Sequence, residues 1–541
     1  MPRLLSYQPW KMLVLVVISV FVGYCSFQIV QFCWRQHTSF LHLIPGPKEG
    51  SFIFGNLREV LLMKGNPSVE HEQWLQRCGP TLSLKGFFGM RLLMTIDTKA
   101  LTHILFNAYD YPKPSITRTL LTEVIGQGII IAEGDEHKRQ RKVMSPAFSH
   151  SHILQFHDIF MEKATQLRQI WTSECLKSSG KAQIDTVSYL SRLTLDIMAL
   201  TGFNFKTDTL NAEDTPNKVH RAIRELLQTT KEIQTMRIFS AICPILRWIP
   251  NEGRTRMQAT DETLDDFGRQ LLAEARIGDT NESSVNNLFS LFVRANGSPD
   301  VPIGQRMSEA DVLSQIPALL LAGHETTSAA VTWTLYFLCR HPRVQKKLRK
   351  ELLAASTDAP TVDEMNALPY LDWVIRETLR VNPPVPSLAR VAGKDDVIPL
   401  RQPFKDSRGT SHYSIPIKEG ELIIIPIMAM NRDKSLWGDD AAEFRPERWE
   451  KIPEAVNAIP GVWSNTLSFL GGPRSCIGYR FSIAQMKVIL FVLIREFELE
   501  LAVPCEEIIS KSTVVQWPTL KSDPAHGPQM PIFVRVHHKE E

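Results

Sequence analysis

The chain has 541 residues, of which 43% are hydrophobic and 22% are charged, as in ordinary globular proteins with a large core. Its formal net charge of +3 argues against nucleic-acid binding through a broad basic surface. The eight cysteines include no C-x-x-C pair, which excludes a zinc ribbon or a redox dithiol and favours reduced thiols in a cytosol-facing protein.

The N-terminal region contains a long uncharged segment. After a short flank, residues 1–11, no Asp, Glu, Lys or Arg occurs from Met12 to Trp34. As a helix with a rise of 1.5 Å per residue, this segment would be about 34 Å long, and a bilayer core is about 30 Å thick. The alternatives are a cleaved signal peptide, which has a shorter apolar stretch, and a buried helix. We therefore expect residues 12–34 to form a single transmembrane anchor.

Residues 35–59 are predicted to connect this anchor to the rest of the chain. Pro45, Gly46 and Pro47 follow one another, and each proline restricts itself and its predecessor to extended conformations. The segment cannot continue a membrane helix, so we expect a stiff hinge.

Residues 60–541 show no internal repeat and no break in composition, so we expect one large domain. Helical patterns dominate its first part, and strand-like runs occur at 80–97 and 413–427. Polar stretches at 275–307 and 401–413 are typical of surface loops. The predicted fold is mainly α with small β-sheets.

The longest predicted helix lies between Ser308 and His341. Ser308 and Asp311 form a candidate capping box, and the pattern ends at a His-Pro pair. The helix is apolar on most faces, so we expect it to pass through the core. Pro317 and Gly323 lie inside it and predict a local distortion.

The sequence FLGGPRSCIG places Cys476 in a glycine-rich stretch directly before another predicted helix. A thiolate is costly to bury unless donors compensate its charge, and a helix N-terminus favours such a charge. Gly471, Gly472 and Gly478 let the backbone approach a flat ligand, and Arg474 is a permanent cation that can pair with a carboxylate on it. The alternative is an inert cysteine in a turn.

This stretch resembles the haem-binding loop of the cytochrome P450 family. All five fixed positions of that loop are matched, by Phe469, Gly472, Arg474, Cys476 and Gly478. The resemblance implies a cytochrome P450 fold. It also implies a haem b cofactor whose iron is held by the Cys476 thiolate, while the other four residues contribute to cofactor binding.

A second motif, AGHETT, lies in the long helix. We expect Gly323 to open space beside the helix and the Thr326 hydroxyl to bond the Ala322 carbonyl, weakening the helix locally. By resemblance, Gly323, Glu325 and Thr326 are catalytic residues. Glu325 and Thr326 match the acid and alcohol that deliver protons as the O–O bond of dioxygen breaks, and Gly323 gives them room. A zinc motif H-E-x-x-H is excluded, because Ser328 stands where its second histidine is required.

The third motif is Glu377-x-x-Arg380, whose two charged side chains share one helix face. Such a pair is usually a solvated bridge when it occurs alone. By resemblance, Glu377 and Arg380 form a structural lock with Arg448, and Arg390 is a ligand of a haem propionate.

The fourth motif is GDEHKRQRKVMSPAF. His137 and Arg141 are four residues apart and share a helical face, whereas Lys138, Arg139 and Lys142 point elsewhere. The resemblance implies the helix whose Trp-x-x-x-Arg contacts the haem propionates, with His137 in place of the tryptophan. The three remaining basic residues are candidates for a face that docks an electron donor.

Together these motifs imply a haem-thiolate monooxygenase. It would insert one oxygen atom from O2 into a C–H bond of a lipophilic substrate, such as a terpenoid or another secondary metabolite, as in the fungal microsomal members that the chain resembles most. Thiolate ligation favours O–O cleavage. The alternatives are an O2-independent haem-thiolate isomerase or dehydratase, a fatty-acid hydroxylase, and a non-catalytic haem sensor.

The electrons must come from another protein, because the chain has no convincing flavin or nicotinamide motif. The resemblance implies a membrane-bound, NADPH-dependent cytochrome P450 reductase as partner. It also implies a single-pass protein of the endoplasmic reticulum with a cytosolic catalytic domain, although basic residues on both sides of residues 12–34 leave the orientation open from sequence alone.

Overall fold

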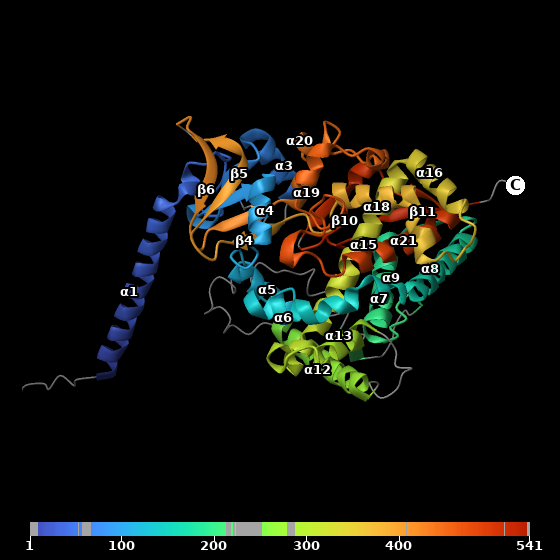
Figure 1. Ribbon diagram of the computed structural model, residues 1–541, viewed down its shortest axis with the longest axis horizontal. Coiled ribbons are helices and arrows are strands. Elements are labelled where there is room, and N and C mark those ends of the chain that lie inside the picture. Colours follow the sequence, from blue (N-terminus) through green and yellow to red (C-terminus); the bar gives the residue numbers. More distant parts are fainter. Residues whose placement is uncertain are drawn as a thin grey trace, which may run out of the picture.

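The computed structural model describes residues 9–51, 53–56, 67–211, 218–219, 222, 252–277, 287–406, 408–512 and 514–537. Parts of the predicted flank (1–8), of the hinge and domain start (52 and 57–66) and of the first predicted loop (278–286) lie outside these residues. The protein is mainly helical with small sheets, as expected from the sequence (Figure 1).

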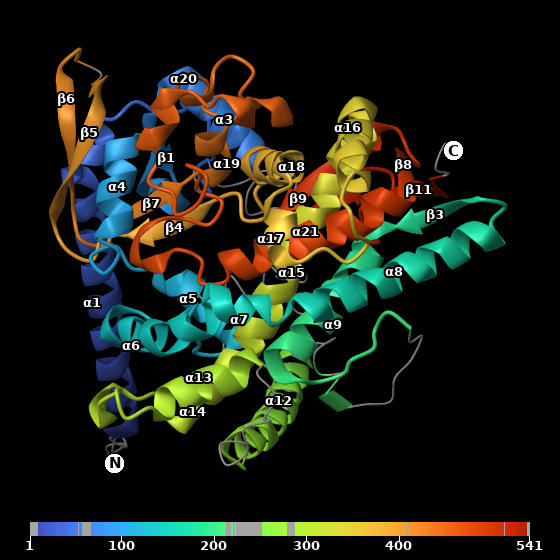
Figure 2. The same ribbon diagram turned by 45° about the vertical axis from the view of Figure 1, so that its right-hand side comes forward.

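The helices form most of the molecule and are, in chain order, α1 (Pro9–Thr38), α3 (Pro67–Cys78), α4 (Thr98–Phe106), α5 (Ser115–Ile125), α6 (Gly134–Met144), α7 (His150–Leu154), α8 (His157–Lys177), α9 (Thr186–Phe203), α12 (Glu252–Ile277), α13 (Leu288–Gly297), α14 (Glu309–Leu313), α15 (Gln315–Arg340), α16 (Pro342–Leu353), α17 (Val362–Asn366), α18 (Pro369–Val381), α19 (Ile427–Asn431), α20 (Lys434–Trp437) and α21 (Tyr479–Glu496). In Figure 2, α15 runs through the middle of the helical part, beside α9 and α21.

The strands are β1 (Thr81–Lys85), β2 (Arg91–Thr95), β3 (Lys181–Asp185), β4 (Leu388–Val391), β5 (Asp396–Lys405), β6 (Ser411–Ile417), β7 (Leu422–Ile425), β8 (Phe497–Leu501), β9 (Ile508–Ser512), β10 (Gln516–Leu520) and β11 (Pro531–Val536). Among the described residues, the largest sheet has the order β1-β2-β7-β4, in which only β2 and β7 are parallel. The other sheets are β3-β11-β8, β5-β6 and β9-β10. In the largest sheet, Arg390 on β4 lies opposite Ile423 on β7.

Two predicted loops are partly regular structure. The segment 401–413 contains the end of β5 and the start of β6, which pair with each other, and the segment 275–307 contains α13. Both expectations were wrong there. Polar composition also occurs in exposed strands, and β5 and β6 have many solvent-facing positions. In 275–307, the apolar residues Leu288, Phe289 and Phe292 are buried on α13.

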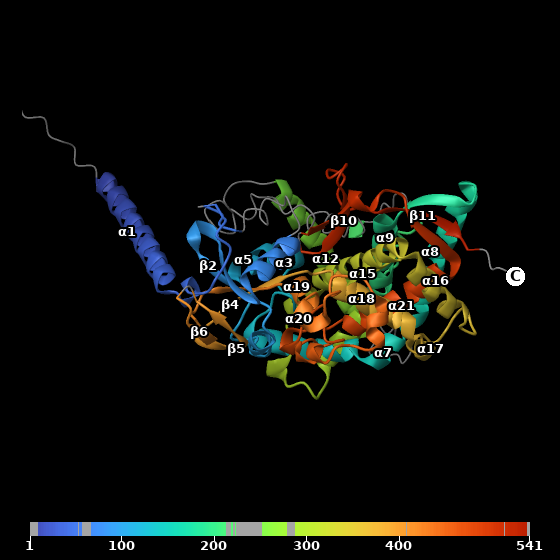
Figure 3. The same ribbon diagram turned by 90° about the horizontal axis from the view of Figure 1, so that it is seen from above.

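Helix α1 covers the predicted segment 12–34 and extends beyond both of its ends. Figures 1 and 3 show it projecting away from the body, and its side chains Leu15, Val20 and Phe27 are exposed. Within the ranges described above, no helix was found that is long and apolar enough to cross a membrane.

The segment after α1 packs against the largest sheet. The Ser83 N–H donates to the Pro45 carbonyl (2.9 Å), and the Arg91 N–H donates to Oε1 of Gln36 at the end of α1 (2.9 Å). A Cβ at Gly46 would overlap the Ser83 carbonyl, so the glycine is required for this close approach. The predicted hinge is therefore attached to β1 and β2 along its described part.

The predicted long helix is divided at Ser314 into α14 and α15. The capping box of Ser308 and Asp311 is present at the start of α14, as predicted. Pro317 has no N–H to donate to the carbonyl four residues earlier, and its ring collides with a regular helix at that point. This accounts for the break, and α15 continues through the core to Arg340.

Candidate active site

The loop that carries Cys476 is closely packed and leads directly into α21. The Cys476 N–H donates to the Phe469 carbonyl (2.9 Å), and α21 begins three residues later at Tyr479. Gly472 has a φ of +69°, and a Cβ there would lie 2.2 Å from the Leu105 carbonyl oxygen. Only glycine fits this position, because it combines a left-handed backbone with a close contact to the end of α4.

The Cys476 side chain is exposed by surface area, yet burial raises the pKa of its thiol. The Gly478 N–H and the charge of Arg141 oppose this rise; the effect of Arg141 on the thiol was not expected from the sequence. The sulfur is therefore accessible from outside the chain, although the protein around it is dense enough to disfavour its charge. Phe469 and Gly478 are half-buried beside it. These features fit a sulfur that coordinates a metal ion carried by a flat ligand.

Helix α6 brings His137 and Arg141 to this loop on one face, as the spacing predicted. Arg141 Nη1 donates to the Ser475 carbonyl (2.5 Å), directly before Cys476. His137 is buried, and burial followed by nearby cations lowers its pKa to about 3. On the other faces, Lys138 is exposed, whereas Arg139 is partly buried and pairs with Asp311 of α14 at 3.0 Å.

Several cationic side chains lie beside the loop, and in the part of the chain that the structure describes they share a single carboxylate, that of Glu133. Arg474 donates to the Ala132 carbonyl (2.9 Å) and pairs with Glu133, which also binds Lys113 (3.2 Å). Burial and the Arg474 charge lower the pKa of Arg390 to about 10 and that of Lys113 to about 8. A buried group of like charges is costly unless an anion joins it.

The cation cluster (Lys113, Arg141, Arg390 and Arg474) also contains an unused donor. Arg474 Nε is buried without a hydrogen-bond acceptor among the described residues. We expected Arg474 to pair only with a carboxylate of the ligand. In the structure, it pairs with the carboxylate of Glu133. The excess charge and the unused donor together fit a ligand that carries carboxylates, as haem does with its two propionates.

Helix α15 provides the second motif. The Thr326 hydroxyl donates to the Ala322 carbonyl (2.8 Å), as predicted. Both residues are only half-buried on a helix that is otherwise largely buried, while Glu325 is buried. A hydrogen bond between the Thr327 and Ser482 hydroxyls (3.0 Å) joins α15 to the first turns of α21. The motif is thereby held against the helix that follows the cysteine loop.

The surroundings of Gly323 differ from the open space that we expected beside it. A Cβ at this position would lie 2.4 Å from Sδ of Met198, which is buried on α9. The space that we expected beside Gly323 is therefore filled by a side chain, and the glycine allows α9 and α15 to pack closely. The sequence did not show this, because Met198 is far away in the chain.

Glu377 is the centre of a fully buried network, as the third motif implied. Its carboxylate accepts from Arg380 Nε (2.9 Å) and Nη2 (2.8 Å) and from Arg448 Nε (3.2 Å). The Trp449 indole (3.0 Å) and the Arg445 backbone N–H (2.9 Å) complete the set. The pair of Glu377 and Arg380 is thus a core element and not a solvated bridge.

Several residues near the site were missed from the sequence. Tyr109, Lys113 and Glu133 belong to none of the four motifs, and only the fold brings them to the loop. Ser475 stands at a variable position of the cysteine motif. The position of Glu133 directly before α6 was the one local signal, because helix N-termini favour acidic residues.

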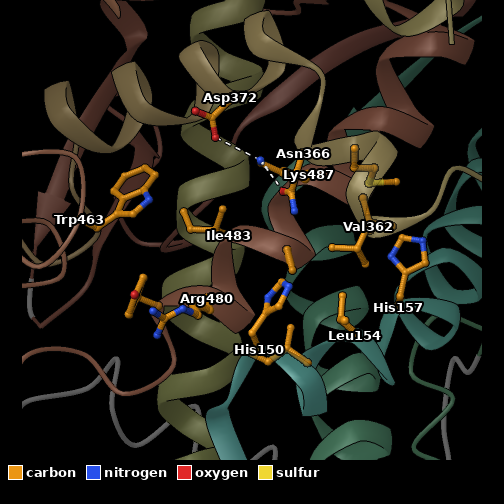
Figure 4. A pocket seen from close by; sticks show the side chains of 15 residues that line it. His150, Leu154, His157, Val362, Asn366, Asp372, Trp463, Arg480, Ile483 and Lys487 are labelled. Atoms are coloured by element: carbon orange, nitrogen blue, oxygen red, sulfur yellow. Dashed lines mark hydrogen bonds and ion pairs between the residues drawn. The ribbon is translucent and has the colours of Figure 1, made fainter. Parts of the chain in front are cut away.

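A separate cavity lies between α7, α17, α18 and α21 (Figure 4). Its volume is about 310 Å³, and its lining includes none of the predicted site residues. In its wall, Lys487 Nζ donates to Asn366 (2.9 Å) and pairs with Asp372 (3.1 Å), so these charges compensate each other. The cavity is distinct from the cysteine site.

Comparison with known proteins identifies the class to which this site belongs. The family model "Cytochrome P450" matches residues 45–521. The chain is 44% identical to cytochrome P450 monooxygenase 205 of Postia placenta over 93% of this chain and 94% of the relative, and 42% identical to monooxygenase 128 of the same fungus over 96% and 97%. It is 32% identical to cytochrome P450 monooxygenase claQ of Ampulloclitocybe clavipes over 91% and 92%.

The chain therefore belongs to the cytochrome P450 family, and it is a cytochrome P450 monooxygenase. Membership of this family implies a haem cofactor and a redox partner.

Proposed function

We propose that Cys476 ligates the iron of haem b and that the protein inserts one atom of O2 into a C–H bond of a lipophilic substrate. The observation that carries this proposal is the position of Cys476. Its sulfur is accessible, and the Gly478 N–H and the charge of Arg141 both favour its thiolate form. Bound through a thiolate, haem supplies the oxidising chemistry of this reaction.

The chain's own residues then have separate tasks. Arg141, Arg390 and Arg474, with His137, hold the propionates and fix the orientation of the ring. Their buried positive charge, which Glu133 balances only in part, becomes favourable when the propionates join it.

Proton delivery is assigned to Glu325 and Thr326. The Thr326 hydroxyl donates its proton to the Ala322 carbonyl, so its oxygen can accept a hydrogen bond from a water molecule or from a protonated side chain. The buried Glu325 is next to it on α15 and supplies the proton that this hydroxyl passes on. Gly323 supports this arrangement through the packing of α15 on α9.

The substrate is proposed to be a terpenoid or another secondary metabolite. Leu319 and Leu320 precede the Thr326 motif, and Val385 to Leu388 follow the Glu377 helix; apart from Ser387, these residues are apolar. If these residues line the substrate pocket, their apolar side chains favour a lipophilic guest, and a membrane position would give such a guest direct access.

Residues 12–34 are proposed to anchor the protein in the membrane of the endoplasmic reticulum with the catalytic domain in the cytosol. The support is the uncharged sequence, its helical conformation, and the exposed apolar side chains of α1 outside the body. An NADPH–cytochrome P450 reductase in the same membrane is the proposed donor. The exposed Lys138 and Lys142 on α6 are suited to dock a negatively charged surface of a partner.

Reconstitution tests this function. Microsomes that contain the full chain and the reductase are supplied with NADPH, ¹⁸O2 and a panel of terpenes and fatty acids, and the products are analysed by mass spectrometry. We expect a terpene product that carries one ¹⁸O atom and depends on NADPH. A product formed without NADPH or without ¹⁸O contradicts the monooxygenase assignment, and exclusive oxidation of fatty acids contradicts the substrate class.

A further inference from the structure

Tyr109 contacts the cation cluster from outside α6. It lies three residues after the end of α4, and its hydroxyl oxygen is 3.3 Å from Nδ1 of His137. The two rings are 5.9 Å apart and inclined by 55°. Lys138 Nζ lies 4.5 Å and Arg474 Cζ 5.5 Å from the centre of the tyrosine ring. Tyr109 thus connects His137 with two cations.

His137 is neutral at physiological pH. Burial lowers its pKa to about 3, and the charges of Arg474, Lys113 and Arg141 act in the same direction. A neutral imidazole has one N–H donor and one acceptor nitrogen. The hydrogen bond made by one ring nitrogen determines which of the two carries the proton.

The tyrosine hydroxyl is the better donor of this pair. A phenol O–H is a stronger acid than the N–H of a neutral imidazole, and an imidazole nitrogen is a stronger base than a phenol oxygen, so the hydroxyl donates and Nδ1 accepts. A hydroxyl that donates to Nδ1 of His137 keeps the imidazole proton on Nε2.

We propose that Tyr109 is a positioning residue that holds His137 in the Nε2–H form, so that His137 donates a hydrogen bond to a carboxylate of the bound haem. This inference rests on the proposed haem binding through Cys476. The arrangement suits a histidine, because an indole carries its N–H permanently, whereas the position of an imidazole proton depends on the partners of both ring nitrogens. Without Tyr109, the other tautomer would turn a lone pair toward the carboxylate.

The test compares Tyr109→Phe in three backgrounds: the natural chain, His137→Trp and His137→Gln. Tryptophan and glutamine both carry an N–H whose position depends on no tautomer, and the second background covers a failure of the first to fold. The readouts are the rate of haem transfer to excess apomyoglobin and the midpoint potential of the haem. Tyr413→Phe, an exposed tyrosine on β6, is the matched control.

In the natural background we expect Tyr109→Phe to speed haem loss about 5-fold, as for one lost hydrogen bond, and to lower the midpoint potential, because the carboxylate keeps more negative charge. In both substituted backgrounds Tyr109→Phe should change neither quantity. An equal effect in every background would show that Tyr109 contributes only through its packing, which would overturn the proposal. The absence of any effect in the natural chain would overturn it as well.

A failure of the proposed function is distinguishable from both outcomes. In that case the natural chain itself would carry no thiolate-ligated haem before any tyrosine is changed.

Discussion

Replacing Glu377 with glutamine tests the buried network most severely. The change is isosteric, so it leaves no cavity, but it removes the charge that five hydrogen bonds converge on. The NH2 group of the new glutamine would also face the N–H groups that now donate to the carboxylate. Arg380 is fully buried, and it loses the carboxylate that neutralises it.

The expected cost follows from this burial. Breaking a buried ion pair by removing one partner costs about 3–5 kcal/mol, because the remaining charge is left uncompensated. Arg448 retains its pair with Asp440 (2.7 Å), so we place the loss for the whole network within this range and not above it. The folding equilibrium constant would then fall by roughly two to four orders of magnitude.

The assay is guanidinium unfolding followed by circular dichroism, with haem absorbance as a second probe. Asp135→Asn is the matched control, because its pair with Lys138 (2.9 Å) is exposed and screened by solvent, so that its removal should hardly change the stability. A loss below about 1 kcal/mol for Glu377→Gln, or equal losses for both variants, would refute the reasoning.

Three further predictions address other elements. Thr326→Ala should keep the haem spectrum but raise the peroxide released per NADPH, whereas Thr332→Ala, which removes the same kind of backbone bond (2.8 Å) from a buried part of α15, should not; equal peroxide yields would contradict the proton-delivery role. Gly323→Ala should cost about 1–3 kcal/mol in unfolding experiments through its collision with Met198, and a double-mutant cycle with Met198→Ala should show coupling; additive losses would mean no contact. Burial lowers the pKa of His71 from 6.5 to about 4, so on acidification the unfolded chain binds the proton first, and stability that is complete above pH 6.5 is lost toward pH 4. The loss should be about 2 kcal/mol between pH 7 and pH 5 and should be absent in His71→Leu; the same pH dependence in both proteins would exclude His71 as its cause.

Features set by local spacing could be predicted from the sequence. The four-residue separation of His137 and Arg141 placed them on one face of α6, and the back-bond of Thr326 to the Ala322 carbonyl needs only an α-helix. The pair of Glu377 and Arg380 was likewise expected from its spacing, although its burial came from the resemblance and not from the charges themselves.

Features set by tertiary packing could not be predicted. The neighbour of Gly323 is Met198 on α9, more than a hundred residues away, and nothing local distinguishes this glycine from one beside a groove. Tyr109 and Lys113 reach the cysteine loop only because the segment between α4 and α5 passes beside α6. The assignment of 401–413 as a loop failed because polar residues are equally suited to solvent-facing strands.

The most direct measurement is the carbon monoxide difference spectrum of the reduced, full-length protein beside its Cys476→Ala variant. If the sulfur at position 476 holds the haem iron, the natural protein gives the Soret band of thiolate ligation and the variant does not. A natural protein without this band, or a variant that keeps it, contradicts the account.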